Sequence, residues 1–451
     1  INDKTFLNCT SLAEVIINSD ATLIGDLAFM NCAFTEIALP ESLTFIGDSA
    51  FRGCANVVDM YIPNLVANIG EAAFLDCKAL STVSIPDSVT YVGEYAFSNT
   101  DSLTATIRFV SGKIASKIMY EQDVAHIVME DGITEIGDYA FAYCRALEDF
   151  VFSKDLTIIG DYVFYDNDVY SELRLPSKVE TIGKYAFAES DKLRTLYIPD
   201  TVTSIGSNAF YHCYELLVDI YLVDGIVNKD VLKGQNVCHI FVEDNIHTIE
   251  DGAFANCTAI ETISLPDTIT SVGTGVFTVS SGNMIATIRG VDGTVDPSVY
   301  DGKTNGIYYL VLDENVDTIG AYAFANADTI KGVVINNTAL IDDYAFYNGT
   351  ALDYLEIGET VTIDDHAFAE CVVLKRVEID KVNAINDYAF FNCISMNDIY
   401  IDSESGLQHI GEHTFEECKM MPKMVLPETV RYIGAYAFYN CNSMAYINIP
   451  D

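Results

Sequence analysis

The sequence contains no tryptophan, few basic residues and no long apolar run. Lys and Arg together number 24 against 66 Asp and Glu, which gives a formal net charge of −42. Because neutralising phosphates requires clustered Lys and Arg, we expect no binding to nucleic acid or to an anionic membrane surface. A membrane helix needs about 18 or more consecutive apolar residues. No run approaches that length, so we expect no membrane insertion by this segment.

The N-terminus also lacks the features of a leader sequence. The chain opens with INDKTFLNCT, which has no basic start, no apolar core and no cleavage site. We therefore interpret the 451 residues as a mature or excised segment whose signal peptide or anchor would lie outside it. Half of the residues are hydrophobic, so the segment can bury a large apolar surface.

One nine-residue frame, I-G-x-x-A-F-x-x-C, recurs along the whole chain. Clear copies are IGDLAFMNC (24–32), IGDYAFAYC (136–144) and IGAYAFYNC (433–441), and an apolar segment that ends in IP or LP precedes the frame. A fixed period in the twenties indicates a solenoid, in which each unit buries its core against its neighbours. The Phe of the frame recurs 17 times, mostly 22 or 23 residues apart, at positions 6, 29, 51, 74, 97, 141, 164, 187, 210, 254, 277, 324, 346, 368, 390, 415 and 438.

Three longer gaps interrupt this series, between positions 97 and 141, 210 and 254, and 277 and 324. Each gap is about two periods long, so each is predicted to hold one degenerate unit, near residues 105–131, 218–246 and 286–316. These segments keep the apolar strand pattern and place Met119, Leu232 and Tyr300 near the Phe position. The whole chain, 1–451, is therefore predicted to be a single solenoid of about 20 units whose ends fall mid-repeat.

Each unit is predicted to contain one strand and one tight turn. The pattern L-x-x-I-x-I alternates as a β-strand does, and equivalent strands would stack into a parallel sheet. Eight of the ten prolines directly follow this strand, where a missing N–H can end the ladder. The Gly after the frame's Ile fits a sharp bend. The A-F-x-x-C stretch is too short for a full helix, so we expect a helical turn whose Phe fills the core.

The full unit, L-x-x-I-x-I-P-x-x-V-x-x-I-G-x-x-A-F-x-x-C, resembles the BspA-like (treponemal) class of leucine-rich repeats from end to end. The resemblance implies a leucine-rich-repeat right-handed superhelix with one continuous parallel β-sheet face and short turns or helical turns on the other. It also implies surface proteins of host-associated microbes that adhere to host proteins or to other cells. Besides the degenerate units, the chain departs from the pattern at Asp342, Asp364 and Asn386, which replace the Gly and leave the local curvature open.

Eleven of the twelve cysteines occupy one position of the frame, three residues after the Phe. Cys behaves as a small buried apolar residue, and we expect free buried thiols rather than metal ligands. Disulfides between adjacent units stay geometrically open but are not required. Cys238, in a degenerate unit, is the exception to the pattern. Other units carry a different small residue at the position: Thr100, Asn167, Ser190, Ser280, Ala327 or Gly349.

The stretch HIGEHTFEEC (409–418) contains H-x-x-E-H, the order of an inverted zinc-protease motif. In the repeat frame, His413 falls two residues before the Phe, where many units carry Tyr and one carries His366. His409 precedes the Gly of the turn, so it cannot share a helical face with His413. We therefore interpret both histidines as repeat residues and expect no metal site, no cofactor and no enzymatic activity.

Two acidic stretches, DNDVYSE (166–172) and IDSESG (401–406), offer carboxylates to calcium but do not match a calcium-binding loop. We interpret them as solvated acidic loops. N-x-T triplets begin at Asn8, Asn256, Asn336 and Asn348, but two of them arise from the frame itself, so they are weak indicators of glycosylation.

Outward strand positions are where a ligand could be recognised, because they change between units while the core does not. Tyr and Arg are favoured at binding surfaces, since they offer a large contact area with a polar end. The alternative is a solvated sheet face without a ligand. Stacked strands of the last units would bring eight candidate binding residues, here called the strand-face set, into one patch: Tyr354, Glu356, Arg376, Glu378, Asp398, Tyr400, Lys423 and Tyr446.

These observations favour a non-enzymatic, adhesin-like binding protein of the cell surface or extracellular space. Its strand face would meet a protein or glycan of a host or a neighbouring cell. The alternative is a rigid acidic spacer that displays flanking domains away from the cell surface. No polar capping unit is visible at either end, which leaves end-to-end self-association open.

Overall fold

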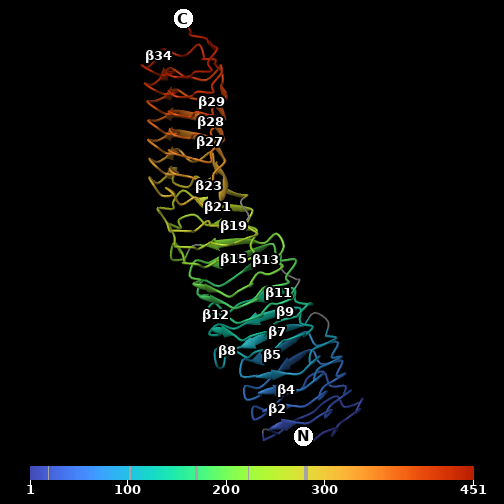
Figure 1. Ribbon diagram of the computed structural model, residues 1–451. Coiled ribbons are helices and arrows are strands. Elements are labelled where there is room, and N and C mark those ends of the chain that lie inside the picture. Colours follow the sequence, from blue (N-terminus) through green and yellow to red (C-terminus); the bar gives the residue numbers. More distant parts are fainter. Residues whose placement is uncertain (19, 101–102, 168–170, 222, 279–282, 451) are drawn as a thin grey trace. The chain divides into compact units, whose positions relative to one another are not determined.

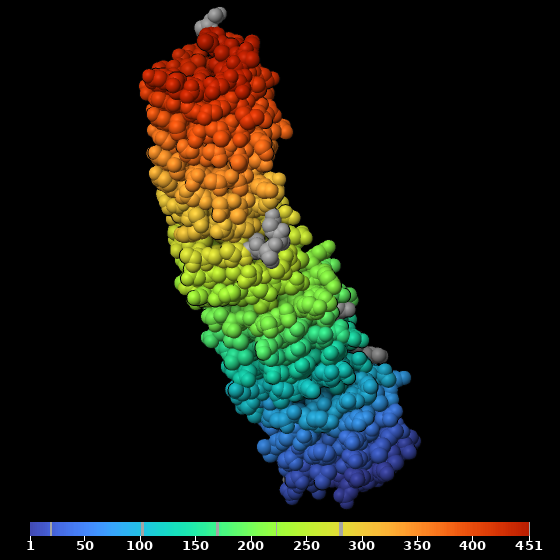
Figure 2. Space-filling model, viewed as in Figure 1, coloured from blue at the N-terminus to red at the C-terminus, as the bar shows by residue number. Residues whose placement is uncertain are grey.

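The computed structural model describes residues 1–18, 20–100, 103–167, 171–221, 223–278 and 283–450 (Figure 1). Two compact units, residues 1–217 and 218–451, are each built from stacked β-coils in which one repeat makes one coil. Within each unit the coils form successive bands of side chains packed against one another (Figure 2). The prediction of a repeat solenoid with parallel strands is confirmed.

In residues 1–217, the coils contribute to two parallel ladders, and the ladder of longer strands begins at Asp59. The longer strands follow the L-x-x-I-x-I pattern and pair in register, as Thr82 with Thr104 and Ile85 with Ile107. These strands are β3 (Asp59–Tyr61), β5 (Thr82–Pro86), β7 (Thr104–Arg108), β9 (His126–Met129), β11 (Asp149–Val151), β13 (Glu172–Arg174) and β15 (Thr195–Pro199). A second ladder, not predicted, consists of two-residue strands that end at the Ile or Val before the Gly, or before Ala115 in the degenerate unit. They are β1 (Leu23–Ile24), β2 (Phe45–Ile46), β4 (Asn68–Ile69), β6 (Tyr91–Val92), β8 (Lys113–Ile114), β10 (Glu135–Ile136), β12 (Ile158–Ile159), β14 (Thr181–Ile182) and β16 (Ser204–Ile205).

Residues 218–451 repeat this arrangement. The longer strands are β17 (Leu217–Tyr221), β19 (His239–Val242), β21 (Thr262–Pro266), β23 (Met284–Arg289), β25 (Ile307–Leu312), β27 (Gly332–Ile341), β28 (Tyr354–Ile363), β29 (Arg376–Lys381), β31 (Asp398–Ile401), β33 (Lys423–Met424) and β35 (Tyr446–Ile447). The two-residue strands are β18 (Ile226–Val227), β20 (Thr248–Ile249), β22 (Ser271–Val272), β24 (Thr294–Val295), β26 (Thr318–Ile319), β30 (Ala384–Ile385), β32 (His409–Ile410) and β34 (Tyr432–Ile433). Strands β27 and β28 run through both ladders because their units lack the proline that ends the strand elsewhere.

The A-F-x-x-C stretch forms consecutive tight turns, so the expected helical turn is wrong in this detail. In the coil at 47–54, Ser49 and Gly53 have φ of 55° and 71°, and a left-handed residue every fourth position cannot belong to an α-helix. Alternate N–H groups close turns within the coil, as Arg52 to Ser49 O at 3.2 Å. The others donate to the next coil, as Phe51 to Ala73 O at 2.8 Å. No helix of the described residues is long and apolar enough to cross a membrane.

The Gly of the frame is required by the close approach of successive coils rather than by the bend that the sequence indicated. The φ of Gly47 is not positive, and a Cβ there would lie 2.6 Å from both Asp26 Oδ1 and the carbonyl carbon of Gly25. Asp26 Oδ1 accepts the N–H of Asp48 at 2.9 Å, and Asp48 Oδ1 in turn accepts the N–H of Glu71 at 2.8 Å. The Asp that often follows the Gly therefore joins neighbouring coils.

The core of each unit is a column of stacked Phe rings. Phe51 is fully buried, and its ring centroid lies 5.5 Å from that of Phe29 and 5.3 Å from that of Phe74. The degenerate units keep this column with other side chains, because Met119, Leu232 and Tyr300 are at most 1% exposed. Their N–H groups donate to the next coil just as the Phe N–H groups do. Their predicted placement at the Phe position is confirmed.

Two described degenerate units are held by a buried aspartate from the preceding coil. Asp87 is 3% exposed; its Oδ1 accepts the N–H of Val110 at 3.0 Å and of Ser111 at 2.7 Å, and its Oδ2 accepts that of Gly112 at 2.7 Å. Asp267 holds the loop 291–293 in the same way. Asp thus replaces the usual ladder contacts where the loop leaves the regular path.

Candidate ligand-binding site

The strand-face set lies mainly on three neighbouring strands. Register pairs Tyr354 of β28 with Arg376 of β29, and Arg376 with Asp398 of β31. One pleat further along, Glu356 pairs with Glu378, and Glu378 with Tyr400. Because alternate residues of a strand share a face, these six side chains form two parallel rows on one surface.

Polar contacts link these rows. Tyr354 Oη donates to Glu356 Oε2 at 2.6 Å, and Arg376 forms an ion pair with Glu378. Arg376 Nε lies 3.7 Å from Asp398 Oδ2, and its guanidinium carbon lies 5.9 Å from the Tyr354 ring centroid. Burial, followed by the hydrogen bond to Glu356, raises the pKa of the Tyr354 hydroxyl to about 12. Five of the six residues, Tyr354, Glu356, Arg376, Glu378 and Asp398, therefore form one interacting network, and Tyr400 lies beside Glu378 by strand register.

Lys423 and Tyr446 are not part of that network. They pair with each other on β33 and β35, which form a separate two-stranded sheet. The unit between Phe390 and Phe415 is 25 residues long, and the short strands β32 and β34 nevertheless continue the sheet of β28 and β30. Tyr446 and Tyr400 are 57% and 54% exposed, so both offer aromatic surface to solvent.

A polar groove of about 350 Å³ lies further along the same strands, at the position where other units have a proline that ends the strand. Such a volume is within the usual range of small-ligand sites, about 300–1,000 Å³. Register pairs Asn337 of β27 with Glu359 of β28, and Glu359 with Lys381 of β29. The polar lining comprises Glu314, Asp317, Asn337, Glu359, Lys381 and Asn383, together with two threonines described below.

The two threonines of this groove occupy the place of a buried apolar residue in other units. Val89 and Val382 hold that place with no exposed surface, whereas Thr338 and Thr360 are 6% and 5% exposed. The Thr338 hydroxyl donates to Asp317 O at 2.8 Å. Within the described part of the chain, Thr360 Oγ1 is buried without a hydrogen-bond partner. Buried polar groups are normally paired, so this hydroxyl requires an explanation.

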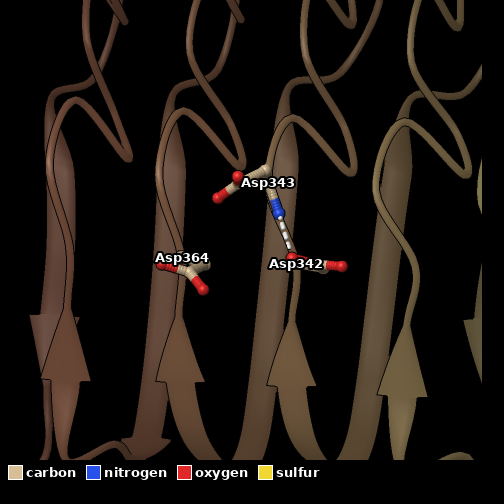
Figure 3. Close-up of side chains that lie close together, drawn as sticks. All are labelled: Asp342, Asp343 and Asp364. Carbon is tan, nitrogen blue, oxygen red and sulfur yellow. Dashed lines mark hydrogen bonds between the residues drawn. The ribbon is translucent and has the colours of Figure 1, made fainter.

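Three half-buried carboxylates, Asp342, Asp343 and Asp364, offer oxygens within 4.8 Å of one another on neighbouring coils (Figure 3). Asp342 Oδ1 accepts the N–H of Asp343 at 2.8 Å. Carboxylate oxygens suit hard cations, so among the described residues this is the group of side chains that could hold one. Burial, followed by the charges of neighbouring aspartates, raises the pKa of Asp343. Two of these aspartates stand where the frame normally has Gly. Of the two acidic stretches noted in the sequence, the one at 166–172 includes residues 168–170, which lie outside the described residues.

The histidines of H-x-x-E-H pack as repeat aromatics, as predicted. His413 stacks between Tyr388 and Tyr436 with ring centroids 4.5 and 4.8 Å away, and its Nδ1 contacts Glu416. His409 lies on β32 and stacks on Tyr432 at 4.7 Å. The two histidines thus belong to a strand and to a turn, and they do not share a helical face.

The comparison with known repeat families decides the classification. A profile for the BspA type leucine rich repeat region matches residues 1–118, 112–227, 225–353 and 339–451. These matches extend over the whole chain. The chain belongs to the BspA-type leucine-rich repeat family.

Solved structures similar to this BspA-type chain include leucine-rich repeat proteins of bacteria. A leucine-rich repeat protein from Bacteroides ovatus is 21% identical, with a TM-score of 0.29 and coverage of 90% of this chain and 88% of that one. A leucine-rich cell surface protein from Faecalibacterium prausnitzii is 20% identical, with a TM-score of 0.25 and coverage of 86% and 87%. No curated protein matches the chain. At these scores, the family assignment rests on the repeat profile alone.

Cys in the BspA-type frame makes a hydrogen bond to the preceding coil that sequence reasoning missed. Cys371 Sγ donates to Phe346 O of the preceding coil at 3.4 Å, and Cys393 Sγ to Phe368 O at 3.3 Å. Asn167 and Ser190 donate in the same way, which explains why they can replace Cys. All twelve cysteines are free thiols; nine are buried as expected, whereas Cys238 and Cys441 are half-buried and Cys9 is exposed. Ser280, another replacement, lies outside the described residues.

Sequence reasoning also missed the groove, although two signals mark it. Phe324, Phe346, Phe368 and Phe390 are each separated by 22 residues, and the strands between them end without proline. In this BspA-type chain, the shorter units therefore build a polar depression beside the strand-face set.

Proposed function

We propose that this protein is a non-enzymatic, adhesin-like binding protein that presents the strand face of β28, β29 and β31 to a protein or glycan ligand outside the cell. The observation that supports it is the register that places Tyr354, Arg376 and Tyr400 on one exposed surface. Tyr and Arg are frequent binding hot spots, because they offer a large contact area together with a polar end that directs hydrogen bonds.

The charges of this face are paired but accessible. The Arg376 side chain is 56% exposed, although it contacts both Glu378 and Asp398. An exposed ion pair contributes only about 0–1 kcal/mol to stability, so a ligand can redirect these side chains at small cost. The surface is therefore suited to recognition more than to holding the fold together.

The test is a screen of the whole chain against arrays of host matrix proteins and glycans. A triple variant, Tyr354→Ala with Arg376→Ala and Tyr400→Ala, is screened beside it. We expect binding by the native chain and at least tenfold weaker binding by the variant, because one hot-spot truncation typically costs about 2 kcal/mol or more.

A matched control removes the same chemistry from the other unit. Arg174 pairs in register with Tyr197, and its guanidinium carbon lies 5.3 Å from the Tyr197 ring centroid. The double variant Arg174→Ala with Tyr197→Ala should bind as the native chain does. Equal binding by all three proteins would reject the proposed surface, and the absence of binding by all of them would favour the rigid acidic spacer.

A further inference from the structure

The polar groove beside the strand-face set carries an excess of negative charge. Glu314, Asp317 and Glu359 line it, and Lys381 is the cation among the described lining residues. Lys381 forms an ion pair with Glu359. The hydrogen bond to Glu359 and the Glu359 charge raise the pKa of the Lys381 ammonium. The charges of Asp380 and Asp402 raise it more weakly. The site is thus already one in which a carboxylate holds an alkylammonium group.

Lys381 is exposed, so that an incoming cation can displace it from Glu359. Its side chain is 60% exposed and that of Glu359 is 59% exposed, so the pair is solvated and weak. An incoming cation could take Glu359 at little cost. It would also reach carboxylates for which the structure shows no ion pair to Lys381, those of Glu314 and Asp317.

Thr360 provides the second, independent observation. It lines the groove, is 5% exposed, and its Oγ1 has no partner among the described residues. Val would fill this place without a polar atom, as Val382 does in the next coil. The fold leaves this buried hydroxyl unpaired in the wall of an acidic groove, and a ligand N–H that reached it would find an unused acceptor.

We propose that this groove binds the cationic end of a lysine or arginine side chain of a protein partner. The inference rests on the proposed function and deepens it, since it names the chemistry of the partner. Glu359 follows Glu356 by three residues on β28, so the groove lies on the same strand as part of the strand-face set. The net charge of −42 would attract such a segment from a distance.

The probe is an acetylated hexalysine amide, titrated by calorimetry into the native chain at low salt and at about 0.15 M salt. Hexaglutamate and a neutral hexasaccharide are titrated in parallel. We expect the hexalysine peptide alone to bind. The double variant Asp317→Asn with Glu359→Gln should bind it about tenfold more weakly, as expected for the loss of two solvated charge contacts.

Three further variants separate a specific groove from diffuse attraction. Glu36→Gln with Glu41→Gln removes the same charge from exposed positions of the other unit and should leave the affinity within twofold of native. Lys381→Gln removes the resident cation and should tighten binding several-fold. Thr360→Val should weaken binding while raising the melting temperature, because it buries a methyl group in place of an unpaired hydroxyl.

Three results would overturn the inference: no binding of hexalysine, an equal loss of affinity in both double variants, or binding of the neutral saccharide instead. If hexalysine fails while an array ligand still depends on Tyr354 and Arg376, the proposed function stands and the groove inference falls. If the Asp317/Glu359 variant is unfolded by circular dichroism, the Lys381→Gln result decides, and unchanged or weaker binding there rejects the groove.

Discussion

Replacing Asp87 by Ala should open the loop that it holds in the degenerate unit 105–131. The carboxylate accepts three backbone N–H groups; the Gly112 bond is buried, and the Val110 and Ser111 bonds are partly buried. A buried donor without an acceptor costs about 1–3 kcal/mol. We assign about 2 kcal/mol to Gly112 and about 0.5 kcal/mol to each of the others, since water can reach them, which gives about 3 kcal/mol in all.

The assay is hydrogen exchange of the loop amides in the whole chain. Local opening that is easier by about 3 kcal/mol should accelerate exchange at residues 110–112 by about a hundredfold, because 1.4 kcal/mol is a factor of ten. Asp87→Asn should lie between, since its amide oxygen keeps acceptors but its NH₂ faces an N–H group. The control is Glu41→Ala, at the same place after a proline but exposed and followed by a regular unit. Exchange at 110–112 that is no faster in Asp87→Ala than in Glu41→Ala would mean that Asp87 does not hold the loop.

Three other predictions concern the core, the thiols and the acidic cluster. Phe51→Ala should destabilise its unit by about 3–5 kcal/mol in urea unfolding, and clearly more than Phe6→Ala, whose partly exposed ring stacks on one neighbour; equal costs would contradict the stacked core. Burial raises the pKa of the Cys371 thiol to about 12, so alkylation of the native chain should label the exposed Cys9 and spare Cys371, as mass spectrometry would show. The folded pKa of Asp343 is raised above its ordinary 3.8, so its destabilising effect begins as pH rises above the ordinary value of the unfolded chain and is complete above the folded pKa. Asp343→Asn should therefore raise the melting temperature at pH 7 and not below about pH 3.8, and a gain that persists in acid would contradict this sign.

The repeat could be predicted from the sequence because the interactions that determine it are local and periodic. The Phe column, the alternating strand and the packing role of His413 all follow from what each position must bury. The left-handed residues of the turn were not predicted, since Tyr, Asn and Ser at those positions carry no glycine signal. Their conformation is set by hydrogen bonds to the next coil, such as Ser49 N–H to Glu71 O at 2.7 Å.

The candidate site was predicted only in part, for a related reason. Outward residues on adjacent strands meet by register alone, so the six residues of β28, β29 and β31 could be placed from spacing. Lys423 and Tyr446 could not, because β33 and β35 form a sheet separate from that of β31. The groove depends on a one-residue shortening and on Thr360 in a valine's place, and such a feature is visible only once the coils are superposed.

Each buried aspartate makes a degenerate unit depend on the coil before it, so the two form one evolutionary unit. Among the prolines that end a strand and precede another unit, Asp follows Pro86, Pro199 and Pro266, each time directly before a degenerate unit, whereas Glu, Asn or Ser follows Pro40, Pro63, Pro176 and Pro427. A duplication that copied residues 105–131 without Asp87 would deliver a loop whose N–H groups have no acceptor. Regular repeats of such a chain can therefore be gained or lost one at a time. A degenerate unit has to be duplicated or deleted together with the coil before it.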